Sequence, residues 1–375
     1  MNIINDYFKK YTDKISFIEL RDNKELNIEG YKISEDTPLP VLTDDLVEEI
    51  KQGNLEEEIK MSNIIDGIIF ILGIDSEFKY SDEYESILSS YDEDIDEYIF
   101  YKGIRNIEDE NYDFGAICFK ALKRVNPENI NGIFNYALAL ETIAKSFFTA
   151  EDDETGLAFI NQSTVELESI LDIDESYPLA YYKLGYHYKF YQQYLKARLT
   201  WNKYIALDKD EVRLQEIRNE LESIESDVIL ETGLTYLAMP DFDRALEEFL
   251  KLLPKLEKWW ELNYLLGLSY KGLTEYDTAI KYFNLALEEN NKVPEVYNEL
   301  GISYILIGDV DDAINTFTDG KEEIQDDYKL FFNRGLTYLQ LEHIDQAYED
   351  ITKAAELNPE DENVALQKQR LEEIL

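Results

Sequence analysis

The fold is decided by residues 265–294, which read LLGLSYKGLTEYDTAIKYFNLALEENNKVP. Gly267 in this stretch recurs at a constant spacing of 34 residues (267−233, 301−267, 335−301), as Gly233, Gly301 and Gly335. Each of these glycines is followed by a tyrosine three residues later, an alanine twelve later, and a phenylalanine or isoleucine sixteen later. A fixed period of this length predicts one small supersecondary unit repeated along the chain.

Both halves of this unit have helical periodicity. Gly267 and Tyr270 share one helical face, and Tyr276, Ala279 and Phe283 form an apolar stripe on a second helix. A glycine inside a helix costs roughly 1 kcal/mol relative to alanine, so its regular return indicates a packing requirement. We therefore predict paired helices that approach closely at the glycine and must stack on neighbouring pairs to bury their faces.

The Leu-Gly, Tyr, Ala, Phe and Pro signature at this period resembles the tetratricopeptide repeat. The resemblance implies an all-α fold, a solenoid of antiparallel helical hairpins. It covers residues 96–361 in about seven helix pairs, and the segment 362–375 is expected to be a terminal capping helix. Gly320 stands where the neighbouring repeats have leucine or alanine, so its helix is expected to fray.

Two intervals in the repeat region are longer than the period. Ala137 to Gly185 and Gly185 to Gly233 each span 48 residues, which is 14 more than 34. The first surplus, near residues 147–160, is predicted to be a loop with an extra turn, because an acidic run interrupts its apolar pattern. The second, near 212–225, is predicted to be a helix because its apolar residues follow helical spacing.

Residues 1–95 do not fit the repeat, and we predict that they form a small, mostly helical amino-terminal domain. No secretory signal is expected, because residues 1–12 have no continuous apolar core and no small-residue cleavage site. No membrane span is expected either, since the most apolar window, residues 64–74, is far shorter than the roughly 20 residues that a spanning helix needs. The expected elements are a short hairpin over residues 16–20 and 26–33, a break at Pro38 and Pro40, and helices over 44–52 and 61–72.

Charge limits the possible partners. The formal net charge is −44, from 80 acidic and 36 basic residues. Nucleic acid and anionic membrane surfaces would be repelled, so we expect a neutral or basic protein or peptide as partner. The single cysteine, Cys118, excludes an intramolecular disulfide and a multi-cysteine zinc site, and it suits a cytoplasmic protein.

Residues that often catalyse reactions are few. His187 and His343 are the only histidines, and neither they nor Cys118 stand in a recognisable catalytic signature. Structural roles are predicted for all of them. The sequence therefore favours a protein that is not an enzyme.

No motif for a metal or cofactor is complete. Asp92, Asp94 and Asp96 imitate the first ligands of a calcium loop, but the required glycine and the final glutamate are missing. The sequence also has no glycine-rich phosphate loop and no dinucleotide fingerprint. We therefore expect no cofactor and no metal.

One surface stripe is more apolar than a solvated face requires. It consists of the residues three before, one after and four after each repeat glycine, and in the resembled family this face lines the concave groove. We predict that it binds an apolar peptide or partner helix with basic flanks. Its members are Tyr182, Tyr186 and Lys189; Leu230, Leu234 and Leu237; Tyr264, Leu268 and Lys271; Asn298, Ile302 and Ile305; and Phe332, Leu336 and Leu339.

Several alternatives stay open. The stripe could be covered by the chain's own insertions or by its amino-terminal domain. Asn333 and Arg334 are similar to a polar pair that holds a peptide carboxylate in the resembled family, but the stripe supplies few other cations, so such a clamp is disfavoured. The leading function is a non-enzymatic scaffold or adaptor. A peptide-responsive regulator with residues 1–95 as its output, or an enzyme with its site there, are the other classes.

Overall fold

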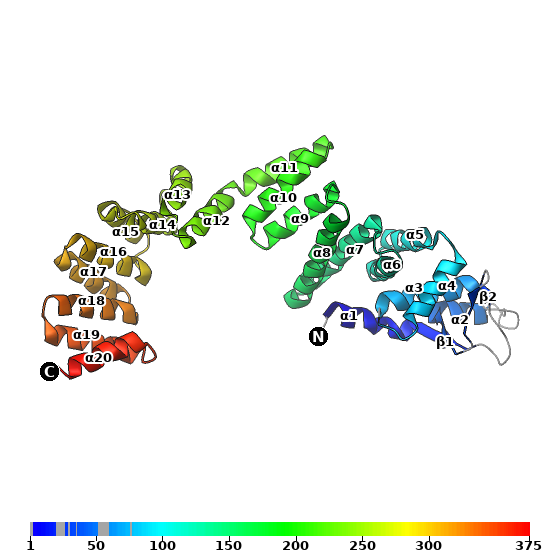
Figure 1. Ribbon diagram of the computed structural model, residues 1–375, viewed down its shortest axis with the longest axis horizontal. Helices are drawn as coiled ribbons and strands as arrows, with labels where there is room; N and C mark the ends of the chain where they lie inside the picture. The colour runs from blue at the N-terminus through cyan, green and yellow to red at the C-terminus, as the bar shows by residue number, and fades with distance from the viewer. Residues whose placement is uncertain (1–2, 20–26, 29–30, 35, 52–59, 76) are drawn as a thin grey trace. The chain divides into compact units, whose positions relative to one another are not determined.

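The computed structural model describes residues 3–19, 27–28, 31–34, 36–51, 60–75 and 77–375. Two compact units make up the chain, Met1–Ile217 and Arg218–Leu375. The division falls inside α11 (Glu211–Ser223). Each unit is described by itself below, and Figure 1 gives the order of the elements along the chain.

The amino-terminal elements of the first unit are short. They comprise α1 (Ile3–Lys9), the 3₁₀ helix η1 (Lys10–Lys14), β1 (Ile15–Ile18), β2 (Asn27–Ile28), β3 (Tyr31–Lys32), β4 (Leu39–Leu42), α2 (Thr43–Lys51), α3 (Met61–Ile74) and α4 (Ser81–Tyr91). The helices predicted over 44–52 and 61–72 are thus confirmed, with small changes at their ends. The sequence prediction did not include α1 or α4.

The strand pairing differs from the predicted hairpin. β1 pairs antiparallel with β4, so that Ile15 lies opposite Leu42 and Phe17 opposite Pro40. β2 pairs instead with β3. The predicted break at Pro40 is also wrong, because a two-stranded sheet has only edge strands, where proline is tolerated. Part of the predicted hairpin, residues 20–26 and 29–30, lies outside the described residues.

One hydrophobic core joins these elements to the first helix pairs. It extends from Ile4 and Phe8 on α1, through α3, to Phe159. α3 packs against β4 and against the second helix of the first pair. A Cβ on Gly67 would come within 2.1 Å of the Pro40 carbonyl oxygen, so this contact requires glycine. Residues 1–95 therefore share their core with the repeats, and a domain boundary at residue 95 stays a prediction.

Seven helix pairs follow between residues 95 and 357, a range that the structure describes completely. The pairs are α5 (Ile95–Glu108) with α6 (Tyr112–Val125), α7 (Ile130–Thr149) with α8 (Asp153–Ile173), α9 (Pro178–Phe190) with α10 (Tyr194–Leu207), α12 (Glu225–Ala238) with α13 (Phe242–Leu256), α14 (Trp260–Gly272) with α15 (Tyr276–Glu289), α16 (Pro294–Ile307) with α17 (Val310–Glu323), and α18 (Tyr328–Gln340) with α19 (Ile344–Leu357). Beyond them, α20 (Glu362–Glu372) packs on α19. The predicted all-α class of paired helices is confirmed.

The structure confirms the predicted form of one insertion and contradicts that of the other. The second is the helix α11, as predicted. The first is not a loop, because α7 runs to Thr149 and α8 begins at Asp153. The surplus residues lengthen both helices, which have 20 and 21 residues against 14 in each of α5 and α6. The acidic run marks the turn between them: Asp152 caps α8 by accepting the amide of Thr155.

Each repeat glycine makes room for a large side chain of its partner helix. A Cβ on Gly267 would lie 2.5 Å from the Phe283 ring, and one on Gly185 would lie 2.1 Å from the Trp201 indole. Both aromatic residues are fully buried. Close approach therefore explains the glycine, as the spacing predicted.

Gly320 also serves packing, and the predicted fraying is wrong. α17 continues past it to Glu323, and Gly320 is buried. A Cβ there would come within 2.9 Å of the Tyr297 ring and 3.2 Å of Leu330. Glycine at this position lets two large neighbours pack directly on the helix backbone.

Candidate functional site

The predicted stripe of the carboxy-terminal unit lies on the first helices of its pairs, α12, α14, α16 and α18. Within this set α14 packs against α16, and α16 packs against α18. Tyr264 and Leu268 contact the core around Phe283, while Phe332 and Leu336 contact the core of the last pair. These side chains are half-buried, so one side of each is anchored in the core and the other faces outward.

The remaining apolar stripe residues of this unit vary in exposure. Leu230 and Ile302 are half-buried, whereas Leu234 is 42% exposed. Burial, with a smaller contribution from the nearby carboxylates of Glu299 and Glu295, raises the pKa of Tyr264 to about 12. The phenol is therefore neutral at physiological pH and can donate a hydrogen bond.

Two polar stripe residues are engaged within the chain. Lys271 on α14 forms an ion pair with Glu299 on α16. Asn298 is only 7% exposed, and its Oδ1 accepts a hydrogen bond of 2.7 Å from Asn333 Nδ2 on α18. Both interactions link the first helices of adjacent repeats. Their structural role was not predicted, because helical spacing shows which residues share a face but not which residues meet across repeats.

The Lys271 pair has a counterpart in the amino-terminal unit with the charges exchanged. Glu141 on α7 accepts a hydrogen bond of 2.5 Å from Lys183 Nζ on α9. Lys271 lies four residues after its repeat glycine and Glu299 lies two before the next one. Glu141 and Lys183 stand at the same offsets, since Ala137 takes the place of the glycine on α7. Extending the stripe to Ala137 would have found Glu141 from sequence.

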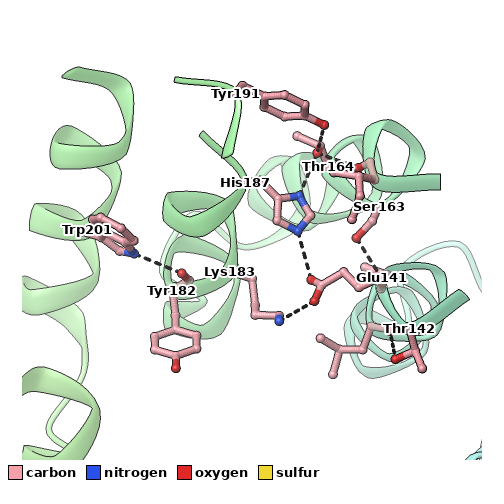
Figure 2. Close-up of polar contacts among 12 residues, drawn as sticks. Glu141, Thr142, Ser163, Thr164, Tyr182, Lys183, His187, Tyr191 and Trp201 are labelled. Carbon is pink, nitrogen blue, oxygen red and sulfur yellow. Dashed lines mark hydrogen bonds and ion pairs between the residues drawn. The ribbon is translucent and has the colours of Figure 1, made fainter. Parts of the chain in front are cut away.

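A buried polar cluster surrounds Glu141, as Figure 2 shows. His187 lies between two partners, with Nε2 at 3.0 Å from Glu141 Oε1 and Nδ1 at 2.8 Å from Thr164 Oγ1. Thr164 also shares a hydrogen bond of 3.0 Å with the Tyr191 hydroxyl. Glu141 and His187 are 7% and 6% exposed. The cluster joins α7, α8 and α9, which agrees with the structural role predicted for His187.

The electrostatics of Glu141 favour its charged form. Burial alone would raise its pKa, but the hydrogen bond from His187 and the charge and hydrogen bond of Lys183 outweigh burial, so its pKa lies below the usual value. A carboxyl group with a lowered pKa stabilises the fold above the pKa it has in the unfolded chain. That contribution is lost as the pH falls through the pKa of the folded state.

Glu141→Gln is therefore expected to lower the free energy of unfolding of the amino-terminal unit by about 1–3 kcal/mol at pH 7, because buried donors lose a charged acceptor. The difference from the wild type should persist at pH 6 and shrink below about pH 4, where the carboxylate of the wild type becomes protonated. Urea denaturation at several pH values measures it. The exposed Glu154→Gln on α8 is the control. A pH-independent difference would show that the charge of Glu141 contributes nothing.

On α9 the stripe contacts another part of the chain. The hydroxyls of Tyr182 and Tyr186 donate hydrogen bonds of 2.9 and 2.5 Å to Glu216 Oε1 on α11. Tyr186 also packs edge-on against Trp201, with ring centroids 5.1 Å apart. At this repeat the inserted helix therefore contacts the predicted binding face, as the alternative of a covered stripe anticipated.

The Asn333 and Arg334 pair is used for packing. Arg334 Nε and Nη2 donate to the two oxygens of Asp350 on α19, at 2.7 and 2.8 Å. Lys321 Nζ donates to the same carboxylate at 3.1 Å, and Asp350 is only 3% exposed. Arg334 is committed to this buried carboxylate, in accord with the prediction against a clamp for a peptide carboxylate.

The other candidate reactive residues show no catalytic geometry in the described residues. Cys118 is buried, and burial raises the pKa of its thiol to about 12, so the reactive thiolate is not formed at neutral pH. His343 is exposed and precedes α19. Over the ranges that the structure describes, no three His, Cys, Asp or Glu side chains are grouped as metal ligands, and no helix is both long and apolar enough to cross a membrane.

Similarity to solved structures is limited. A tetratricopeptide repeat protein from Parabacteroides merdae is 16% identical over 74% of this chain and 98% of its own, with a TM-score of 0.34. TTC0263 from Thermus thermophilus is 13% identical over 63% and 98%, with a TM-score of 0.33. YrrB is 20% identical over 68% and 99%, with a TM-score of 0.29. No curated protein sequence matches this one significantly.

The family comparison matches two specific parts of the chain. The tetratricopeptide repeat family matches residues 261–292 and 328–361. These ranges contain the helix pairs α14 with α15 and α18 with α19, each with a glycine packed against its partner helix. The intervening pair, α16 with α17, has the same spacing and the same glycine contact. The chain thus contains tetratricopeptide repeats at residues 261–292 and 328–361.

Proposed function

We propose that this protein is a cytoplasmic, non-enzymatic interaction scaffold whose carboxy-terminal unit binds an apolar segment of another protein. The observation that carries the proposal is the stripe of apolar and aromatic side chains on α12, α14, α16 and α18, which are half-buried except for the exposed Leu234. Its proposed contact residues are Leu230, Leu234, Tyr264, Leu268, Ile302, Phe332 and Leu336. Tyr182 and Tyr186 are also proposed contact residues. Their hydroxyls donate hydrogen bonds to Glu216, so these bonds must break before the hydroxyls bind a partner.

Aromatic anchors supply most of the expected affinity. One side of Tyr264 and one side of Phe332 pack against the hydrophobic cores of their own repeats. A side chain that is fixed in the free protein loses little conformational entropy on binding, and aromatic residues in desolvated pockets dominate interface energies. These two residues are therefore the proposed principal contacts.

Charge favours a partner with basic flanks. The net charge of the chain is −44, and Glu295 and Glu299 lie near the Tyr264 hydroxyl. Lys271 is paired with Glu299, so it neutralises one carboxylate and leaves Glu295 to attract a cation. A lysine or arginine next to the apolar segment would be drawn to this position, and salt would weaken the attraction.

The test uses two immobilised peptides with the same core of leucine and phenylalanine residues. One peptide is flanked by lysines and the other by glutamates. The wild type is expected to prefer the lysine-flanked peptide, with binding that weakens as salt is added. Tyr264→Ala with Phe332→Ala should weaken binding tenfold or more, since truncating one hot-spot residue typically costs about 2 kcal/mol or more.

Two further variants make the test decisive. Leu234→Glu changes an exposed stripe position and should also reduce binding while the fold is kept. Leu250→Ala with Leu285→Ala is the matched control, because these leucines are 38% and 43% exposed on the second helices α13 and α15. Circular dichroism checks the fold. Unchanged binding by the folded stripe variants, or equal binding of both peptides, would contradict the proposal.

A further inference from the structure

A hollow of about 320 Å³ in the amino-terminal unit collects basic side chains. Among its lining residues, Lys120, Lys123 and Arg124 come from a single helix, α6, where their spacing places them on one face. The other walls come from α1, α7 and α8 and consist of Ile4, Asn5, Tyr136, Gln162 and Glu166. A concentration of cations is unexpected in a chain whose net charge is −44.

Two of these three cations are neutralised inside the unit. Lys123 Nζ lies 2.5 Å from Glu166 Oε2, and the Glu166 side chain is 3% exposed. Arg124 forms ion pairs with Glu85 and Asp82 of α4. The charges of Lys123 and Arg124 therefore have partners without any ligand.

Lys120 has no such partner. Its Nζ donates a hydrogen bond of 3.0 Å to Asn5 Oδ1, a neutral acceptor, and lies 5.4 Å from the centre of the Phe8 ring. Within the described residues it makes no ion pair with a carboxylate. Burial, with a smaller contribution from the charge of Lys9, lowers its pKa to about 8, although the carboxylates of Asp75 and Glu166 oppose this shift. An ammonium group with three donors and one neutral acceptor in a partly desolvated site is incompletely satisfied.

We propose that this hollow is a binding site for a small carboxylate, with Lys120 as its cationic anchor. One unpaired positive charge matches the single negative charge of a carboxylate better than the charge of phosphate, which is partly a dianion at pH 7. Ile4 and Tyr136 supply apolar contacts for a short carbon chain, and the volume lies at the lower end of the range for small-molecule sites, about 300–1,000 Å³. The carboxylate could belong to a free organic acid or to the end of a peptide.

This site is independent of the stripe and lies in the other unit. It is tested with the full chain at pH 7 by calorimetric titration with four probes: sodium butyrate, inorganic phosphate, and one apolar tripeptide with either a free or an amidated carboxyl terminus. Saturable binding of butyrate or of the free tripeptide, with phosphate and the amidated tripeptide at least tenfold weaker, is expected. Whichever of the two carboxylates binds more tightly identifies the source.

Two substitutions test whether the carboxylate binds at Lys120. Lys120→Met keeps the length of the side chain and removes its charge, so it should weaken carboxylate binding at least tenfold. Lys145→Met, on the exposed face of α7, should leave it within twofold of the wild type. Circular dichroism checks both folds.

A measurement on the wild type avoids any folding effect of the variants. Acetylation of Lys120, followed by mass spectrometry, should slow when the bound carboxylate is present, whereas acetylation of Lys145 should not change. The proposal is overturned if no probe shows saturable binding, if phosphate or the amidated tripeptide binds as well as the carboxylates, or if Lys120→Met binds them unchanged.

Discussion

Phe283→Ala is expected to lower the free energy of unfolding of the carboxy-terminal unit by about 3–5 kcal/mol, the range for deleting a buried aromatic ring. Phe283 is fully buried, and its ring packs directly on the backbone of Gly267. A Cβ atom on Gly267 would lie only 2.5 Å from this ring. Removing the ring leaves a cavity between α14 and α15. The two helices already lie in close contact, so they cannot move together to close the cavity.

Native-state hydrogen exchange of α14 and α15 in the full chain measures this effect without assuming that both units unfold together. Leu285→Ala is the matched control, because Leu285 lies on the same helix, is 43% exposed and should change stability by less than about 1 kcal/mol. If Phe283→Ala destabilised the unit no more than Leu285→Ala, the glycine and aromatic contact would not be what holds the repeat together.

Asp350→Asn should be comparably severe, with a loss of about 3–5 kcal/mol, because it removes the carboxylate to which two largely buried cations are bound. Arg334 and Lys321 are 15% and 16% exposed, and both donate to the Asp350 carboxylate. Burial lowers the pKa of Lys321, and Asp350 opposes that effect. Without the carboxylate, both cations would remain in a poorly solvated site.

The same exchange measurement on α17, α18 and α19 tests this prediction. Lys353→Gln breaks the exposed pair with Glu356, whose side chains are 46% and 62% exposed, and it should cost about 1 kcal/mol or less. Adding Lys321→Met to Asp350→Asn should recover part of the loss. A double variant as unstable as Asp350→Asn alone would mean that uncompensated charge is not the cause.

The repeat region was largely predictable because its determinants are local and periodic. The glycine spacing alone located the four carboxy-terminal helix pairs, and the same offsets placed Trp201 on Gly185. The acidic run at residues 151–154 misled the prediction of a loop. The turn between α7 and α8 has only three residues, 150–152, and the apolar residues on both sides of it extend the two helices.

The amino-terminal region was less predictable because its contacts are distant in sequence. β1 pairs with β4 across an intervening pair of strands, and no local pattern specifies such a register. α1 did carry a local signal, since Ile4 and Phe8 are four residues apart on one buried face. For the stripe, helical spacing predicted which residues share a face. It did not predict their partners Glu299, Asn333 and Glu216, because these depend on how neighbouring helices pack.

The most direct test of the central claim, that the stripe is a binding surface, is hydrogen exchange of the full chain with and without the lysine-flanked peptide. Binding should slow exchange in the first helices α14, α16 and α18, and leave the second helices α15 and α17 nearly unchanged. Protection of α15 and α17 instead, or no protection within residues 218–375 under conditions where the peptide is bound, would contradict the claim.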